Sequence, residues 1–270
     1  MNGQIRSVSA TRIVQGESRH STETLTQEAA LQIRINGQSY TVTMRTPGND
    51  RILVAGLLFT EGIVSRPDDL IDMREIANAS GDTTLIVEVQ LPEAALTNKR
   101  IFNRSITSSA SCGVCGKIDL CDLVIPASQI STSRKISILA IPEMFDSMRR
   151  HQSTFDATGG SHAAALLTVD DEVLCVQEDI GRHNAVDKVI GDLFMTDMLQ
   201  HAEVLLVSGR VSYEIVAKCA RARIPFLLAV SAPSSLAVDF CNSVGITLIG
   251  FCRDQRATVY THSERVFLHS

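Results

Sequence analysis

The second half of the chain alternates short apolar runs with longer amphipathic segments, and this alternation limits the fold more than any other feature. The apolar runs predict strands at residues 163–168, 173–176, 203–207, 226–230 and 246–250. The amphipathic segments predict helices at residues 142–150, 183–198, 212–221 and 235–244. Strands that alternate with helices over short loops imply right-handed crossovers and a largely parallel sheet. We therefore expect an α/β domain with helices flanking the sheet.

The first half of the chain follows another pattern, which is typical of a mixed α+β domain. Residues 31–35 and 38–44 alternate apolar and polar side chains on either side of Asn36-Gly37. An Asn-Gly pair between two alternating runs is a strong signal of a β-hairpin. We therefore expect an antiparallel pair of strands at this position.

A helix and a further strand complete the first half. Asn49 or Asp50 can cap a helix that ends near Gly62, and residues 83–91 predict a strand. A polar stretch at residues 128–135 then separates the two patterns. We expect an N-terminal α+β domain over residues 1–130 and the α/β domain over residues 131–270.

Composition narrows the class of protein. The net charge of −5 argues against a nucleic-acid partner, and no apolar run approaches the roughly 18 residues of a membrane span. Residues 1–20 are polar and lack the apolar core of a signal peptide, which favours a cytoplasmic protein. The seven cysteines are irregularly spaced, so we interpret them as free thiols.

Two of these thiols, Cys112 and Cys115, lie in a run of Ser, Ala and Gly at residues 109–116. Such a run has little to pack in a core, which predicts an exposed loop whose cysteines are placed to react. Thiolate is the reactive form, and a neighbouring thiol or cation can stabilise it. The pair therefore indicates one of three chemistries: metal binding, dithiol exchange or sulfur carriage.

The rest of the sequence favours one of these three chemistries. Structural zinc takes four ligands, often as two pairs, but this chain has one CxxC and scattered remaining cysteines. The nucleobase deaminase signature is also incomplete, since the Glu expected two residues after His162 is Ala164. Thioredoxin-like exchange would place the pair at the start of a helix, which Gly113 and Gly116 disfavour. Sulfur carriage needs only one accessible thiolate and fits best.

The loops that follow the predicted strands form a second candidate site. These loops span residues 177–184, 208–214, 231–235 and 251–256, and three of them hold Arg182, Arg210, Arg253 and Arg256. Ligands of open α/β sheets bind beyond the carboxyl ends of the strands, and helix N-termini there attract anions. We interpret the loops as a pocket for a phosphorylated, nucleotide-like ligand. The alternative is that Ser212 and Ser235 are ordinary helix caps and the arginines are solvated.

Six motifs together resemble the FdhD family, the formate dehydrogenase accessory sulfurtransferases. They lie at residues 112–116, 160–165, 178–188, 208–214, 231–237 and 258–261. The resemblance implies a dimeric, cytoplasmic sulfur carrier with a cytidine-deaminase-like α/β core. It also implies that sulfur arrives from a cysteine desulfurase as a persulfide. The acceptor would be the molybdenum of the bis-molybdopterin guanine dinucleotide cofactor, before that cofactor enters formate dehydrogenase.

Site residues follow from the same resemblance. Cys112 would carry the persulfide and Cys115 would assist or resolve it. The family's cofactor-binding stretch falls on Phe251, Cys252, Arg253, Asp254, Gln255 and Arg256, to which we add Arg210, Arg182 and His183. Some relatives carry a further cysteine where this chain has Gly160-Ser161. We expect GDP to mimic part of the cofactor and no zinc to bind tightly. The competing function is a non-catalytic chaperone that binds the cofactor or the dehydrogenase.

Overall fold

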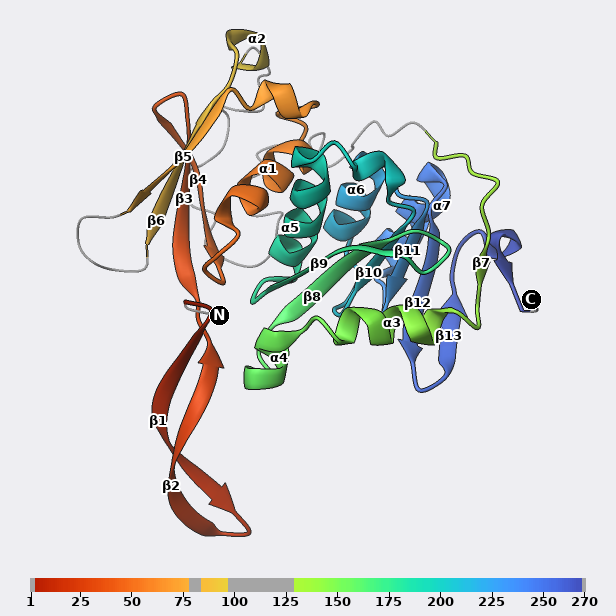
Figure 1. The fold of residues 1–270 in the computed structure, drawn as a ribbon. Helices are drawn as coiled ribbons and strands as arrows, with labels where there is room; N and C mark the ends of the chain where they lie inside the picture. The colour runs from red at the N-terminus through yellow and green to blue at the C-terminus, as the bar shows by residue number, and fades with distance from the viewer. Residues whose placement is uncertain (1–2, 78–83, 97–128, 269–270) are drawn as a thin grey trace.

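The computed structural model describes residues 3–77, 84–96 and 129–268 (Figure 1). Two sheets with their helices form the body, and a long two-stranded hairpin projects from it. The predicted thiol pair, Cys112 and Cys115, lies outside the described residues. None of the helices in these three ranges is long and apolar enough to cross a membrane.

The larger sheet has six strands in the order β13-β12-β11-β10-β8-β9. The strands are β8 (His162–Leu167), β9 (Val173–Asp179), β10 (Val204–Val207), β11 (Phe226–Ala229), β12 (Thr247–Arg253) and β13 (Arg256–Val259). Only the pairs β10–β11 and β11–β12 are parallel, and the other three neighbouring pairs are antiparallel. The predicted α/β class is confirmed, but a largely parallel sheet is wrong.

The length of two connections explains two of the three antiparallel pairs, β8–β9 and β12–β13. Residues 168–172 join β8 to β9, and residues 254–255 join β12 to β13. A parallel crossover needs a dozen or more residues, so these short loops permit only antiparallel neighbours.

Helices cover both faces of this sheet. They are α3 (Ile141–Arg149), α4 (Ser153–Thr158), α5 (Arg182–Met195), α6 (Tyr213–Arg221) and α7 (Ser235–Val244). Alternate residues along each strand face opposite sides. Leu205 and Leu227 accordingly pack with α5, α6 and α7, while Leu206 and Leu228 pack with α3 on the other face.

The smaller sheet has the order β4-β3-β6-β5. Its strands are β3 (Ala29–Ile35), β4 (Gln38–Arg45), β5 (Asp72–Ala77) and β6 (Leu85–Gln90), with α1 (Asp50–Thr60) packed against it and a short α2 (Glu93–Leu96) after it. The predicted hairpin around Asn36-Gly37 is confirmed. Asn49 lies at the N-cap position of α1, but its side chain makes no capping bond and donates to Gln177 instead, at 2.8 Å.

The two sheets share one core because α1 packs directly on α5. Gly56 and Gly191 face each other at this crossing, and a Cβ on Gly56 would lie 1.8 Å from the carbonyl oxygen of Asp187. Only glycine permits such a close approach of two helix backbones. Apolar side chains of α1 and α5 therefore belong to a single buried cluster that continues into the six-stranded sheet.

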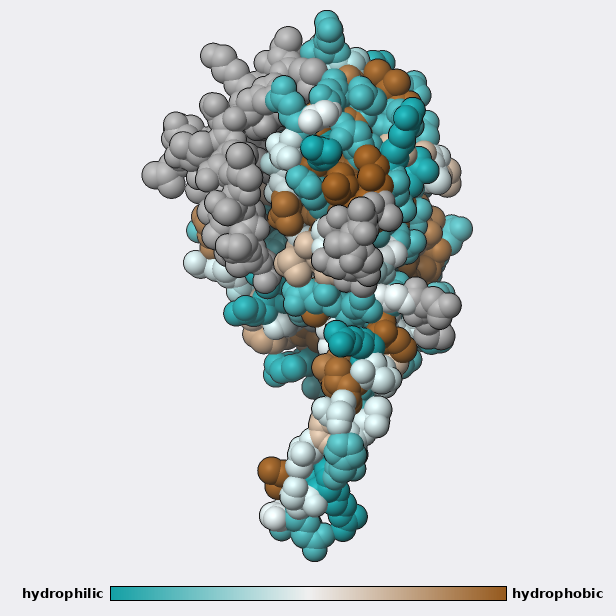
Figure 2. Space-filling view, turned by 90° about the vertical axis from the view of Figure 1, so that its left-hand side faces the viewer, coloured by the Kyte–Doolittle hydropathy of each residue, from teal (hydrophilic) through white to brown (hydrophobic). Residues whose placement is uncertain are grey.

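Strands β1 (Ile5–Val14) and β2 (Glu17–Thr26) form the projecting hairpin. It is mostly polar and stands clear of the body in both views (Figures 1 and 2). Its base is held to α4 by a 2.7 Å hydrogen bond between the hydroxyls of Thr26 and Thr158. The remaining short strands, β7 (Ile136–Ser137) and β14 (Val266–Phe267), pair in parallel beside α3.

Candidate functional site

A tight hairpin between β12 and β13 carries most of the predicted cofactor-binding stretch. Arg253 and Arg256 pair across it, and the two turn residues, Asp254 and Gln255, have φ values of 54° and 56°. A two-residue hairpin loop of this type requires positive φ at both positions, which Asp tolerates better than Gln. Phe251, where the strand register shifts, also has a φ of 54°. The backbone is therefore strained at three positions of this hairpin.

A cavity of about 760 Å³ lies between this hairpin, α3 and the edge of the six-stranded sheet. Ile180, Ser208, Val230 and Cys252 line it, and they lie at or just after the carboxyl ends of β9, β10, β11 and β12. The predicted convergence of these strand ends at one edge is therefore observed. The volume is that of a typical small-molecule or cofactor site.

The wall of the cavity formed by the β12–β13 hairpin carries basic side chains. Arg253 and Arg256 both line the cavity. Arg253 lies 3.9 Å from the carboxylate of Asp254, while the guanidinium of Arg256 stacks 5.3 Å from the centre of the Phe251 ring. No ion pair joins Arg256 to an acid within the described ranges. Arginine is the side chain best suited to bidentate contacts with phosphate, so this wall is equipped for an anion.

The other predicted cations lie apart from this lining. Arg182 and His183 begin α5, and Arg210 is exposed after β10, but none of the three lines the cavity. His183 Nε2 lies 3.5 Å from the hydroxyl of Ser212 at the start of α6. The structure thus brings the residues of the hairpin together at the cavity and leaves Arg182, His183 and Arg210 outside its lining.

His162 lies between the cavity and the start of α5. It lines the cavity, its Nδ1 lies 3.5 Å from the Ser208 hydroxyl, and Arg182 is nearby on α5. Burial, and then the charge of Arg182, lower the pKa of the His162 imidazole, while Asp179 opposes them. The neutral imidazole is therefore favoured in the folded protein at neutral pH.

Cys252 is the one predicted site thiol that the described residues contain. It is buried, its thiol points to the carbonyl of Ile249 at 3.6 Å, and burial raises its pKa to about 12. Burial also raises the pKa of Cys175, Cys219 and Cys241. These thiols are protonated at neutral pH and are poor nucleophiles. The reactive role expected of Cys112 and Cys115 concerns residues outside the described ranges.

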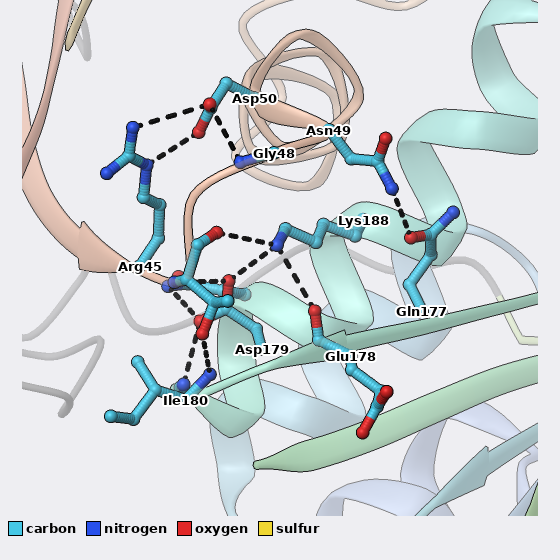
Figure 3. Close-up of polar contacts among 12 residues, drawn as sticks. Arg45, Gly48, Asn49, Asp50, Gln177, Glu178, Asp179, Ile180 and Lys188 are labelled. Atoms are coloured by element: carbon cyan, nitrogen blue, oxygen red, sulfur yellow. Dashed lines mark hydrogen bonds and ion pairs between the residues drawn. The ribbon is translucent and has the colours of Figure 1, made fainter. Parts of the chain in front are cut away.

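The motif at residues 178–188 proves to be mainly a structural network (Figure 3). Lys188 and Asp179 form a 2.8 Å ion pair, with side chains 1% and 0% exposed. Asp179 also accepts the backbone N–H groups of Thr46 and Gly181, and Lys188 donates to the carbonyl oxygens of Thr46 and Glu178. This network fixes the end of β9 to the segment that leads into α1.

Glu178 in the same motif supports the cavity wall directly. Its carboxylate accepts hydrogen bonds from the backbone N–H groups of Thr154 and Phe155, at 2.7 and 2.8 Å. The hydroxyl of Ser161 donates to the same carboxylate at 2.7 Å. Glu178 therefore sets the position of α4 and of the loop that follows it, both of which line the cavity.

The wall formed by α3 and α4 was missed by the sequence-based interpretation. Phe145, Arg149, Gln152 and Phe155 line the cavity from this side. The helix was predicted, but its amphipathic pattern shows only that one face is buried. Within residues 3–77, 84–96 and 129–268, no group of three His, Cys, Asp or Glu side chains is arranged to hold a metal ion. The expectation about zinc thus stays a prediction for the whole chain.

An α/β protein with a basic, cofactor-sized cavity at the carboxyl edge of its sheet is the class that this geometry defines. Comparison with known proteins gives the family. Residues 26–267 match the FdhD/NarQ family, and the chain belongs to it.

Relatives and a solved structure agree with this assignment. A protein of Mycobacterium tuberculosis named sulfur carrier protein FdhD is 44% identical over 256 residues, which cover 90% of this chain and 92% of the relative. A protein of the same name from Sulfolobus acidocaldarius is 38% identical and covers 98% and 100%. The fold matches a crystal structure from Desulfotalea psychrophila, proposed to be a formate dehydrogenase accessory protein. The TM-score is 0.75, with 21% identity over 98% of this chain and 100% of that chain.

Proposed function

We propose that this chain carries sulfur as a persulfide on Cys112 and delivers it to the molybdenum cofactor of formate dehydrogenase. The observation that carries the proposal is the basic cavity at the sheet edge, found in a member of a family whose relatives are named sulfur carriers. The cofactor is the substrate, and Arg253 and Arg256 would hold its phosphates.

The transfer chemistry needs one thiolate that is free to move between two partners. The Cys112 thiolate attacks the outer sulfur of the persulfide on a cysteine desulfurase, whose own thiolate leaves. The outer sulfur on Cys112 then passes as a sulfido ligand to the metal of bis-molybdopterin guanine dinucleotide, which starts in its reduced state and supplies the two electrons, while Cys112 leaves as a thiolate. Cys115 stabilises the Cys112 thiolate, or later attacks the inner sulfur of the persulfide, which forms a disulfide with Cys112 and releases hydrosulfide. Cys252 takes no part, because its thiol is buried and protonated.

Three finer statements belong to the same proposal. The core is cytidine-deaminase-like, with His162 as a remnant of a lost zinc site, since no Glu follows two residues later. The protein is a homodimer that works in the cytoplasm. Size-exclusion chromatography with light scattering tests the dimer.

Peptide mass spectrometry tests the central step. After incubation with a cysteine desulfurase and cysteine, the peptide that contains Cys112 should gain one sulfur atom. Cys112→Ser should abolish formate dehydrogenase maturation in complemented cells, since a hydroxyl cannot carry sulfane sulfur. Cys115→Ser should retain part of the activity. Persulfide found only on Cys115, or full activity without Cys112, would overturn the assignment.

A second candidate is a chaperone that binds the cofactor without carrying sulfur. One observation favours it: every cysteine in the described residues is buried, so the cavity itself offers binding groups and no reactive thiol. A Cys112→Ala variant decides between the two. A chaperone would keep both nucleotide binding and maturation of the dehydrogenase, whereas a carrier would keep only the binding.

A further inference from the structure

The α3–α4 wall of the cavity contains a polar side chain that has no partner. Gln152 is only 4% exposed and lines the cavity. Its side-chain amide makes no hydrogen bond to another residue of the described ranges, and its polar atoms are not fully enclosed by protein, so they are accessible from the cavity. A ligand in the cavity could satisfy this amide.

A carboxylate without a cation lies on the same wall. Asp146 is an exposed residue that lines the cavity from α3, and the basic side chains that follow it on the helix have other partners. Arg149 pairs with Asp156, and Arg150 pairs with Glu143. In the part of the chain that the structure describes, Asp146 therefore makes no ion pair.

A carboxylate is out of place in a site built only for phosphate. The hairpin wall presents Arg253 and Arg256, which attract anions, and its own carboxylate, Asp254, lies 3.9 Å from Arg253. Asp146 has no such cation within the described ranges and repels anions. Its presence is useful if the ligand also has an uncharged part that donates hydrogen bonds. The arginines of the hairpin would then bind the phosphates, and Asp146 would bind the uncharged part of the ligand.

The same wall also presents a flat surface. The Arg149 guanidinium lies 4.9 Å from the centre of the Phe155 ring, and both side chains line the cavity. Nucleobases stack on aromatic rings and on guanidinium planes. Stacking alone accepts any base, so selection among bases requires polar groups in the plane of the base.

We propose that Asp146 and Gln152 form a guanine-selective base subsite on the α3–α4 wall. This inference rests on the proposed function, which supplies the guanine nucleotide. The carboxylate of Asp146 accepts the two parallel donors of guanine, N1–H and the 2-amino group. The amide of Gln152 donates to O6. Adenine lacks this pair of donors, hypoxanthine lacks the 2-amino group, and xanthine has an oxygen in its place.

Calorimetry with GDP, IDP and XDP tests the subsite. The unaltered protein should bind GDP about tenfold or more tightly than IDP, as expected for loss of one charge-assisted hydrogen bond. Asp146→Asn should bring the GDP-to-IDP affinity ratio close to one and improve binding of XDP, because the new amide donates to the 2-oxo group. Using a ratio removes the general effect of deleting a negative charge near the phosphates.

Glu143→Gln is the matched control, since it removes the same charge from the same helix at a residue that does not line the cavity. This variant should keep the GDP-to-IDP ratio. Gln152→Met should weaken GDP and IDP equally, because both carry O6. A GDP-to-IDP affinity ratio near one in the unaltered protein would overturn the subsite, and so would a ratio that Asp146→Asn leaves unchanged. In either case, GDP binding itself would still support the proposed function. No GDP binding at all would overturn both.

Discussion

The two faces of the six-stranded sheet differ in how completely they are covered. On one face α5, α6 and α7 pack side by side and α1 packs on α5, so the apolar cluster there is continuous and closed. On the other face, among the described elements, α3 packs on the sheet without further long helices beside it. The cavity lies at the carboxyl edge next to α3.

This difference shows how one sheet provides both stability and a binding site. The closed side also contains the buried polar networks, including the ion pair of Lys218 with Asp187 at 2.7 Å. The open side keeps charged side chains such as Arg253 and Arg256 at a cavity wall. We therefore expect substitutions on the closed side to change stability and substitutions on the open side to change ligand binding.

The largest expected effect is on the closed side. Lys188→Met leaves the Asp179 carboxylate buried without its cation, although both side chains are almost completely buried in the native protein. Removing one partner of a buried ion pair typically costs about 3–5 kcal/mol. Urea unfolding should show a decrease of this size in the free energy of unfolding.

Two further variants sharpen this first test. Combining Lys188→Met with Asp179→Asn should recover much of the loss, because no unpaired charge is then buried. Arg253→Met removes a charge from the open side and should change the free energy of unfolding by only about 0.5 kcal/mol or less. Equal losses for the two single variants would show that the closed and open sides do not differ in this way.

The next largest effect is expected on the open side and on binding. Arg256→Ala should weaken GDP binding by about tenfold or more, the equivalent of a charge-assisted phosphate contact of roughly 1.5–3 kcal/mol. Calorimetry at two salt concentrations measures this, since phosphate contacts weaken with ionic strength. Arg210→Ala is the control, because Arg210 is exposed and does not line the cavity. Equal affinities for GDP and guanosine would rule out a phosphate site.

The sequence predicted most of the closed side, because the spacing of apolar residues in a buried helix or strand shows which element it forms and which face is buried. The predicted helix at residues 235–244 agrees with α7, and the strand predicted at 226–230 agrees with β11. The convergence of loops at one edge was also predicted, since β10, β11 and β12 run parallel and their carboxyl ends share that edge. Hydrophobic periodicity alone is sufficient to predict buried helices and strands of this kind.

Features that depend on contacts between distant segments were predicted less well, whichever side of the sheet they lie on. The β1–β2 hairpin has few apolar side chains, so its strands carry no clear alternation of buried and exposed residues. Glu178 and Lys188 were interpreted as part of a functional motif, yet they bond to α4 and to Thr46. Pairings of this kind appear only when the chain is folded.

A smaller effect is expected from loosening the cavity wall. Glu178→Gln replaces one acceptor oxygen with an amide donor and disturbs the bonds from Thr154, Phe155 and Ser161. Loss of such bonds should lower the free energy of unfolding by about 1–2 kcal/mol and weaken GDP binding a few-fold. Urea unfolding and calorimetry measure the two quantities. Ser161→Ala removes one of the bonds and should have a smaller effect on both; an effect larger than that of Glu178→Gln would contradict this role.

The smallest expected effect concerns pH and the half-buried His162 at the edge of the open side. Its pKa is lowered in the folded protein by burial and by Arg182, with Asp179 opposing them. The unfolded chain has an ordinary histidine pKa of about 6.5, so it binds a proton at pH values where the folded protein does not. Stability therefore declines as pH falls below about 6.5 and levels off once the folded pKa is passed.

His162→Asn removes this contribution and leaves the other titrating groups in place. Urea unfolding from pH 8 to pH 5 should show a constant difference between the two proteins at the alkaline end. Below about pH 6.5 the unaltered protein should lose stability faster than the variant. Arg182→Met should raise the pKa of His162 and flatten the same part of the profile, since it removes one of the two causes of the shift. A profile that His162→Asn leaves unchanged would show that this imidazole is not held neutral by the fold.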